Sequence, residues 1–463
     1  MMKLLTGLAA LFTAAVPAAA QDAPHQREAR QIFERLISFR TAAGHGQVPA
    51  MANYIAETLR AGGVPAEDVL ILPHEETAAL LVRVPGSDSA AAPLLFSGHM
   101  DVVDARPEDW ERSPFALVEE NGYFFGRGTG DNKTGIAAMV STILRMRAEG
   151  HRPRRTLVFA FVGDEETGME TTRLVAAHPW VRGAEYAINT DAGGGSLSED
   201  GRPLVYGVQG AEKTYASFRV TIRNPGGHSS RPRRDNAIYD LAQALLRIQA
   251  LQFPAMSNPL TRASLLVTAR TMPDETGRLL TRYAENPEDT EAAEALLANP
   301  QTAVEISTTC VATMLSAGHA ENALPQRAEA TVNCRIFPGD SVANVQAKLV
   351  EAIGNSAVAV EVIGNPIVSP VSEPRDDVMA AIARSIHARY PGLPITPYLE
   401  AGGTDGLVYR NAGIPTYASS GAFYKESDIF FHGLNERIAV PSFYMAVDHI
   451  YELARELGGA AQD

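Results

Sequence analysis

The stretch TLVFAFVGDEETG, residues 156–168, is an apolar run that ends abruptly in acidic residues. The pattern is typical of a buried parallel strand that presents catalytic groups at its carboxyl end. Successive side chains near a strand end point to opposite sides, so one of Glu165 and Glu166 can bind a metal while the other faces a bound water. A Glu-Glu pair taken alone is more often part of a solvated loop. Its meaning therefore depends on the rest of the chain.

Helices and strands are expected to alternate on both sides of this stretch. A short apolar strand at 94–96 leads into the sequence SGHMD at 97–101, and a helix with one apolar face is predicted at 133–149. Another apolar stretch ends at Asp191, and α/β character returns after residue 366. This alternation predicts an α/β catalytic domain with a mainly parallel sheet, built from residues 25–211 and 366–460.

Residues 212–365 have a different pattern, which predicts a second domain inserted into the first. The expected elements are strands at 215–222, 304–314, 327–337 and 358–363, with helices at 236–251 and 341–353. Their β-α-β-β-α-β order is the ferredoxin-like pattern. The long stretch at about 253–303 is expected to be an insertion in this domain.

Composition and charge limit the classes of partner. The chain has 463 residues, 45% of them hydrophobic and 20% charged, with a formal charge of −14. That length allows two domains with separate cores. The acidic balance argues against nucleic acid or an anionic membrane surface as partner.

Residues 1–20 resemble a secretory signal peptide. Lys3 precedes an apolar stretch at 4–16, and three alanines at 18–20 form a small-residue cleavage site. The apolar stretch is too short for a membrane span. We therefore expect a secreted, periplasmic protein with no membrane attachment after cleavage. The alternative is an uncleaved first helix of the domain.

The chain has two cysteines, Cys310 and Cys334, on predicted neighbouring strands. An oxidising compartment permits a cross-strand disulfide, and two buried free thiols are the alternative. Two cysteines cannot form a thiolate zinc site of the finger type, so any metal must be bound by histidines and carboxylates.

Acidic residues and histidines recur at the ends of predicted strands and in Gly-rich loops. They are His99, Asp101, Asp131, Glu165, Glu166, Asp191 and His432. Two imidazoles with several carboxylates suit zinc or a similar ion. Each residue also has a structural alternative: a strand-end histidine can belong to the core, and Asp131 can cap the following helix.

Four separated motifs carry a family resemblance. They are SGHMDVV at 97–103, GRGTGDNK at 126–133, GDEETG at 163–168 and PGGHSS at 225–230. In this order they resemble the dinuclear zinc aminoacylase/carboxypeptidase family of metallopeptidases, which includes glutamate carboxypeptidase, succinyl-diaminopimelate desuccinylase and carboxypeptidase S. The resemblance covers nearly the whole mature chain. It implies a zinc-peptidase catalytic domain, an inserted dimerisation or lid domain, and a homodimer.

The resemblance also implies two Zn²⁺ ions per chain, with Co²⁺ or Mn²⁺ as alternatives. His99 and Asp191 would bind one ion, and Glu166 and His432 the other. Asp131 would bridge the two ions. A pair of metals of this kind activates water for hydrolysis.

Catalytic roles are implied for three further residues. Glu165 would be the general base, which takes a proton from water and passes it to the leaving amine. Asp101 would support His99, and His228 would reach the active site of the partner subunit to stabilise the oxyanion. Structural alternatives for His228 include an ordinary turn residue.

Substrate contacts are implied for Asn322, Arg335 and the loop at Gly403. Arg335 suits a terminal carboxylate. The alternative for Asn322 and Arg335 is that they are polar residues on a strand surface.

The sequence is most similar to the carboxypeptidase S-like branch, which includes both carboxypeptidases and hydrolases or synthases of N-acyl amino acids. We expect an enzyme that cleaves the amide bond next to a C-terminal amino acid, with a peptide as the preferred substrate and an N-acyl amino acid as the alternative. Two non-enzymatic alternatives are a ligand-binding protein on the same scaffold and a metal-stabilised structural dimer. Glu165 argues against both, because neither needs a general base.

Overall fold

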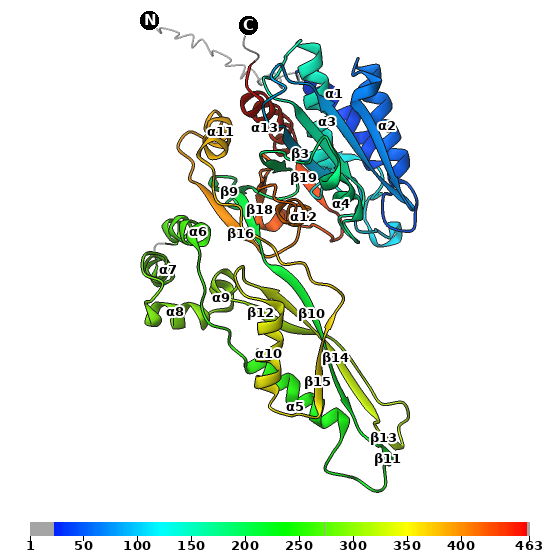
Figure 1. Cartoon of the computed structure of the whole chain (residues 1–463), viewed down its shortest axis with the longest axis vertical. Coiled ribbons are helices and arrows are strands. Elements are labelled where there is room, and N and C mark those ends of the chain that lie inside the picture. The colour runs from blue at the N-terminus through cyan, green and yellow to red at the C-terminus, as the bar shows by residue number, and fades with distance from the viewer. Residues whose placement is uncertain (1–22, 273, 461–463) are drawn as a thin grey trace, which may run out of the picture.

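The computed structural model describes residues 23–272 and 274–460, so the expected signal peptide at 1–20 lies outside the described residues. The chain forms a larger α/β part from which a smaller part projects (Figure 1). The chain leaves the larger part at Lys213, between β9 (Pro203–Glu212) and β10 (Thr214–Arg223), and returns to it after β15 (Val358–Ile363). The fold class is therefore the expected one, an α/β domain with a second domain inserted into it.

A ten-stranded sheet forms the centre of the larger part. Its order is β1-β2-β6-β3-β7-β17-β9-β8-β18, and β16 also pairs with β9. The remaining strand bounds are β1 (Val69–His74), β2 (Thr77–Val84), β3 (Leu94–His99), β6 (Leu157–Val162), β7 (Ala187–Asn189), β8 (Gly194–Leu197), β16 (Ile395–Glu400), β17 (Thr416–Ala418) and β18 (Phe423–Lys425). The central strands β6, β3, β7 and β17 are parallel, whereas β1 and β2 are antiparallel to their neighbours. The sheet is thus parallel at its centre and mixed toward its edges.

Helices cover both faces of this sheet. One face packs against α1 (Pro24–Ile37), α2 (Val48–Ala61), α3 (Lys133–Ala148), α11 (Asp376–His387) and α13 (Val440–Gly458), and the other against α4 (Glu170–Ala177) and α12 (Gly406–Asn411). On β6, Phe159 and Phe161 belong to the first core, whereas Val158, Ala160 and Val162 belong to the second. Burial on both faces explains why the strand is an unbroken apolar run.

Strands β3, β6 and β7 end at the same edge of the sheet. His99 is level with Val162 across one pair, and Ser97 is level with Asn189 across the other. Because the strands are parallel, the acidic segments that follow them leave the sheet side by side.

A three-stranded sheet brings two distant loops together. It consists of β4 (Val118–Glu120), β5 (Tyr123–Phe125) and β19 (Arg437–Ala439), in the order β19-β5-β4. Arg437 pairs with Phe125 in antiparallel register. The segment before β19, which contains His432, therefore lies beside the segment after β5, which contains Asp131.

The smaller part has the predicted ferredoxin-like order. Its antiparallel sheet is β12-β14-β10-β15, with β12 (Thr309–Ala317) at one edge and β14 (Arg327–Ile336) inside. Helices α5 (Ala237–Ala250) and α10 (Val342–Ile353) share one core with this sheet. A two-stranded antiparallel sheet of β11 (Gly227–His228) and β13 (Ala323–Leu324), the β11–β13 pair, lies at the end farthest from the larger part (Figure 1).

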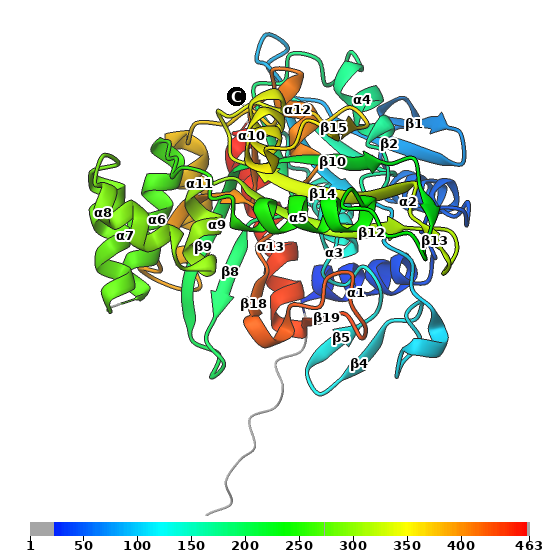
Figure 2. The ribbon, with the colours of Figure 1, turned by 90° about the horizontal axis from the view of Figure 1, so that it is seen from below.

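The predicted insertion forms four helices with their own core. They are α6 (Pro259–Thr271), α7 (Glu275–Glu285), α8 (Thr290–Leu297) and α9 (Pro300–Ile306). Leu260 of α6 packs with Ala211, Phe337 and Leu399, so the insertion adjoins the junction of the two parts. It lies on the opposite side of the smaller part from the β11–β13 pair (Figures 1 and 2).

One predicted boundary is wrong, because the strand expected at 304–314 begins only at Thr309. Residues 304–306 belong to α9, which has Pro300 in its first turn and is capped by the Asn299 side chain. Proline at this position and an asparagine cap both favour a helix start, and they outweigh the β-like sequence of the final residues.

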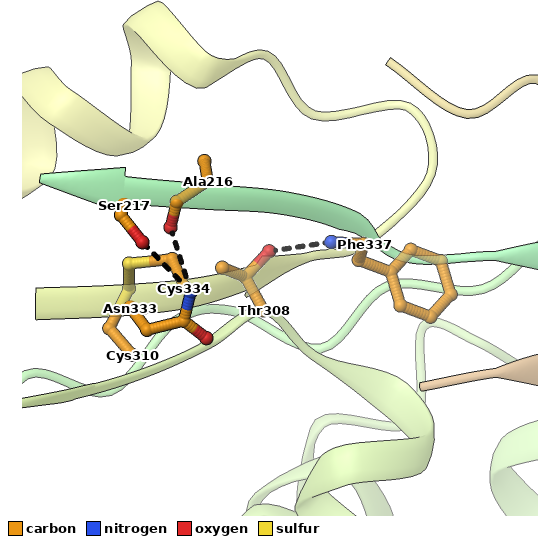
Figure 3. Close-up of a disulfide and its surroundings, with 7 residues drawn as sticks. All are labelled: Ala216, Ser217, Thr308, Cys310, Asn333, Cys334 and Phe337. Atoms are coloured by element: carbon orange, nitrogen blue, oxygen red, sulfur yellow. Dashed lines mark hydrogen bonds between the residues drawn. A yellow bond between two sulfur atoms is a disulfide. The ribbon is translucent and has the colours of Figure 1, made fainter. Parts of the chain in front are cut away.

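Of the two alternatives for the cysteines, the structure contains the disulfide. Cys310 and Cys334 lie directly opposite each other on β12 and β14 and are bonded (Figure 3). Beside them, the Asn333 amide donates a hydrogen bond of 3.1 Å to the Ser217 hydroxyl (Figure 3). The disulfide thus joins the edge strand to the interior of the small sheet. Within the part of the chain that the structure describes, no helix is long and apolar enough to cross a bilayer.

Candidate metal centre and active site

Two groups of metal-binding side chains meet at the carboxyl edge of the large sheet. In the first group, His99 Nε2 lies 2.7 Å from Asp131 Oδ1 and 3.2 Å from Asp191 Oδ1. In the second group, His432 Nε2 lies 3.0 Å from both Asp131 Oδ2 and Glu166 Oε1. Asp131 therefore offers one carboxylate oxygen to each group.

Glu165 lies beside these two groups. One potential ligand atom from each of His99, Glu165 and Glu166 falls within 4.8 Å of the others. The Asp101 carboxylate accepts hydrogen bonds from the backbone N–H groups of Glu165 and Glu166, at 3.1 and 3.0 Å. The Asp101 carbonyl oxygen also lies 3.0 Å from His99 Nδ1. Asp101 thus orients both the imidazole and the loop that carries the two glutamates.

Glu436 connects the segments that carry Asp131 and His432. Its buried carboxylate accepts hydrogen bonds from the backbone N–H groups of Gly130 and Asp131, at 2.7 and 3.2 Å. The Arg127 guanidinium donates a further bond to it at 2.6 Å. Because Glu436 follows His432 by only four residues, one side chain fixes the relative positions of two ligands from distant parts of the chain.

Asn132 provides a second connection, toward Asp191. Its amide donates a hydrogen bond of 2.9 Å to the Thr190 carbonyl, and the Thr190 hydroxyl donates one of 2.9 Å back. The peptide bond before Asn132 is cis. Helix α3 begins at Lys133 with Asn132 at the N-cap position, so Asp131 does not cap this helix.

The electrostatics show an excess of buried negative charge. Burial, and next the charge of Asp191, raise the pKa of Glu165 well above its usual range, and burial does the same to the pKa of Asp191 itself. Burial would also raise the pKa of Asp131, but hydrogen bonds with His432 and His99 hold it below its usual range. Hydrogen bonds with Asp131 and Glu166 raise the pKa of His432 to about 10. Buried carboxylates in this arrangement are stabilised by additional cationic charge.

The donor set fits a divalent metal. Three groups of donor atoms lie close enough to hold an ion: His99 with Asp131 and Asp191, Asp131 with Glu166 and His432, and His99 with Glu165 and Glu166. All the donors are imidazole nitrogens or carboxylate oxygens, which suit zinc and related ions. The first two groups contain the five ligands expected from the sequence.

Two of the expected substrate-binding positions meet at the junction of the domains. Arg335 of β14 donates a hydrogen bond of 3.1 Å to the Ala401 carbonyl, and its guanidinium lies 4.7 Å from the centre of the Tyr215 ring. Gly403 is two residues further along the same loop, and the position that a Cβ would take there is open. An arginine of the small domain thus lies against the Gly403 loop of the large one.

The structure does not bring His228 and Asn322 to the metal centre of their own chain. Both lie in or beside the β11–β13 pair, where the Ser229 N–H donates a hydrogen bond of 3.0 Å to the Asn322 carbonyl. His228 is exposed, and its Nδ1 lies 2.8 Å from the Ser230 hydroxyl. Figure 1 shows this pair of strands at the opposite end of the molecule from the large sheet.

The structure adds residues that the sequence analysis assigns no role. Glu436 and Asn132 position metal ligands, and the buried Glu212 accepts a hydrogen bond of 2.7 Å from the Thr404 N–H in the Gly403 loop. Asn132 lies in the quoted motif at 126–133, which is the signal that points to it, whereas Glu436 lies outside the four quoted motifs. Glu212 has no such signal, because its acceptor role depends on contacts between segments far apart in the sequence.

Comparison with known families decides the assignment. Residues 95–456 match the sequence profile of Peptidase family M20/M25/M40. The chain belongs to this family. The expected aminoacylase/carboxypeptidase resemblance is thereby confirmed, and the chain is a hydrolase of the metallopeptidase and amidohydrolase class.

Individual relatives of this M20 protein act on different substrates. It is 29% identical over 383 residues to the N-fatty-acyl-amino acid synthase/hydrolase PM20D1 of Xenopus tropicalis, an alignment that covers 81% of this chain and 74% of that protein. Its fold is similar to that of the M20 family metallo-carboxypeptidase Sso-CP2 of Sulfolobus solfataricus, with a TM-score of 0.70, 19% identity and coverage of 93% and 99% of the two chains. It is also similar in fold to the YXEP protein of Bacillus subtilis, described as a dinuclear metal binding peptidase, with a TM-score of 0.60, 14% identity and coverage of 94% and 98%.

Proposed function

We propose that this M20 protein is an exported hydrolase with two Zn²⁺ ions, which cleaves the amide bond next to a C-terminal amino acid. The observation that carries the proposal is the position of Asp131, whose two oxygens contact two separate histidine-carboxylate groups. A carboxylate shared by two such groups would hold two ions as close together as a two-metal site requires. His99 and Asp191 would hold one ion, and Glu166 and His432 the other.

Ions bound there would lower the pKa of a water molecule and polarise the carbonyl that it attacks. Glu165 would accept the proton of this water and return it to the leaving nitrogen, as a general base and acid. Its backbone N–H is held by Asp101, so its side chain keeps one orientation toward the centre.

Arg335 and the Gly403 loop would bind the free carboxylate of the C-terminal amino acid. A guanidinium binds a carboxylate through two parallel hydrogen bonds, which fixes both its position and its orientation. Such a site recognises the free carboxylate of a peptide or an N-acyl amino acid equally well. Peptides are the preferred substrate. The activity for which the Xenopus relative is named favours N-acyl amino acids as the second candidate.

A homodimer would complete the site. Strand β12 is an edge strand, and its Val311, Met314 and Leu315 side chains are each at least 60% exposed. Tyr239 and Leu246 of α5 add exposed apolar area, and α5 packs against β12. Surfaces of this kind mark protein interfaces. His228 lies far from the candidate metal centre of its own chain. Pairing of two copies through this surface would allow His228 of one copy to act in the site of the other.

Product analysis by mass spectrometry tests the proposed function. The protein with residues 1–20 removed is given peptides and N-acyl amino acids, with zinc and in parallel with a chelator. We expect zinc-dependent release of single C-terminal amino acids. The absence of any chelator-sensitive cleavage would contradict the proposal. Export is tested separately, by N-terminal sequencing of the full-length protein from periplasmic and cytoplasmic fractions.

A further inference from the structure

An exposed apolar surface adjoins the His432 side of the metal centre. Its members are the large apolar side chains on both sides of His432 in the segment between β18 and β19. We call this surface the apolar lip: Ile429, Phe430, Phe431 and Leu434. Their exposed fractions lie between 37% and 52%. Four large exposed apolar residues in six consecutive positions are unusual for a soluble surface and mark a binding site.

The lip is held rigidly against the metal ligands. The Phe431 ring packs so closely on Gly130 that a Cβ there would lie 2.3 Å from it, and Gly130 directly precedes Asp131. The same ring makes an edge contact with Tyr424, at 5.3 Å between centroids. The Arg437 guanidinium lies 4.6 Å from the centre of the Phe430 ring. Rigid apolar groups lose little conformational entropy when they bind a ligand.

Arg335, which is proposed to bind the substrate carboxylate, is connected by a chain of hydrogen bonds to the Asp191 side of the centre. The Gly193 N–H, two residues after Asp191, donates a hydrogen bond of 3.2 Å to the Tyr398 hydroxyl, which donates one of 3.0 Å to Glu400. The Glu400 carboxylate accepts a bond of 2.8 Å from the Ala401 N–H, and the Ala401 carbonyl accepts the bond from Arg335. Arg335 therefore connects to the Asp191 side, whereas the lip lies on the His432 side, with Asp131 between them.

The positions of Arg335 on one side of the centre and of the apolar lip on the other set the orientation in which a substrate would bind. We propose that the apolar lip binds the acyl part of the substrate, on the carbonyl side of the scissile amide bond, and selects extended apolar acyl groups. The inference rests on the proposed function, because it places the terminal carboxylate at Arg335. The apolar group has two possible sources, an aliphatic acyl chain or an apolar side chain at the penultimate residue of a peptide.

A series of acyl groups on one C-terminal amino acid tests the proposal. N-acetyl, N-butanoyl and N-octanoyl compounds are compared with dipeptides whose first residue is Gly, Leu or Phe, to separate the two sources. Complete burial of one methylene favours binding about fourfold. We therefore expect kcat/KM to rise at least about tenfold from acetyl to octanoyl, since the lip buries only part of the chain. A similar rise is expected from Gly to Phe if peptides are the source.

Variants locate the effect on the lip. The double variant Ile429→Ser/Leu434→Ser should lower the octanoyl-to-acetyl ratio of kcat/KM about tenfold. The control Leu174→Ser/Leu204→Ser changes two leucines of similar exposure on α4 and β9 and should keep the wild-type ratio. An unchanged ratio in the lip variant would overturn the proposal, and so would a wild-type rate independent of acyl length and of the first dipeptide residue.

Binding is measured in parallel by calorimetry, with the zinc-loaded Glu165→Gln protein, so that the lip is tested even without turnover. The Glu165→Gln protein is compared with the same protein carrying the two lip substitutions. Loss of the octanoyl preference on adding the lip substitutions supports the inference, and equal affinities for acetyl and octanoyl compounds in both of these proteins overturn it. Failure of the proposed function has a different signature, the absence of chelator-sensitive hydrolysis of every compound. If the lip variant is monomeric while wild type and control are dimeric, the surface belongs to a subunit contact and the proposal is wrong.

Discussion

Asp131 is the residue on which the site depends. Each of its oxygens contacts the imidazole of a different group, one from the end of β3 and one from the loop before β19. Its position is fixed by its neighbours, through the Glu436 carboxylate on one side and the Asn132–Thr190 pair on the other. The precision of the centre therefore depends on residues that do not themselves bind metal.

Glu165→Gln should abolish turnover without loss of metal. The glutamine preserves size and packing but cannot accept a proton, so kcat should fall by a factor of about 10² to 10⁴. Zinc content, measured by elemental analysis, and the thermal unfolding midpoint should match those of the wild type. Near-normal activity in this variant would eliminate Glu165 as the general base.

Glu436→Gln should weaken metal binding. In the wild type, the Glu436 carboxylate accepts hydrogen bonds from the Arg127 guanidinium and from the backbone N–H groups of Gly130 and Asp131. A glutamine would turn its NH₂ group toward one of these donors and lose that hydrogen bond, so the Asp131 segment shifts. Metal affinity should fall about 10- to 100-fold, measured by competition with a chromophoric chelator.

Glu185→Gln is the matched control for this prediction. Glu185 also accepts hydrogen bonds from arginines, Arg155 and Arg375, but precedes β7 at the end of the strand far from the centre. Its substitution should leave metal affinity unchanged. Equal affinities in the two variants would show that Glu436 does not position the ligands.

At the scale of single residues, the sequence predicts the candidate metal ligands better than the residues that position them. His99, Asp131 and Glu166 lie in three of the four quoted motifs, and Asp191 ends an apolar stretch. The structure places these four residues and His432 in groups that could hold a metal ion. Glu436 acts by accepting hydrogen bonds from backbone N–H groups, which depends on where a distant loop lies. No pattern of residue types in its own segment expresses that contact.

Among the elements, the central strands were predictable because burial on both faces leaves a continuous apolar run. The boundary of β12 was not, since residues 304–306 resemble a strand but are helical in α9, whose start Asn299 and Pro300 favour. The apolar pattern alone does not separate short buried helices from strands.

The packing of α11 and α13 predicts a dependence of stability on pH. His449 of α13 is fully buried, 2.7 Å from the Ser385 hydroxyl and 2.8 Å from the Ser419 hydroxyl. Burial lowers its pKa to about 3, against the opposing charge of Glu452. Below about pH 6.5 the unfolded chain binds a proton here that the folded protein does not, so stability is complete above that pH and falls toward pH 3.

His449→Gln should therefore weaken this dependence, because glutamine keeps hydrogen-bonding groups but does not titrate. The difference between wild type and variant in free energy of unfolding should change by about 1.4 kcal/mol per pH unit between pH 6 and pH 4. Urea unfolding of both metal-free proteins measures it, and subtraction removes the contributions of all other groups. A difference independent of pH would contradict the assigned protonation state.

At the scale of the whole molecule, the β11–β13 pair, to which His228 belongs, lies at the end of the smaller part farthest from the large sheet (Figure 1). If the homodimer forms as proposed, Glu165→Ala and His228→Ala chains should complement each other. In a hybrid dimer, one site receives an intact Glu165 from one chain and an intact His228 from the other. A statistical mixture should then recover up to about a quarter of wild-type activity. No recovery after demonstrated subunit exchange would show that His228 does not act across the interface.

The number of zinc ions bound per chain tests the central claim most directly. Native mass spectrometry of the zinc-loaded protein should show two ions per wild-type chain, and one in each of Asp191→Ala and Glu166→Ala, with amide hydrolysis lost in both variants. A wild-type chain that is fully active with one ion, or variants that still bind two, would contradict the assignment of two metal groups joined by Asp131.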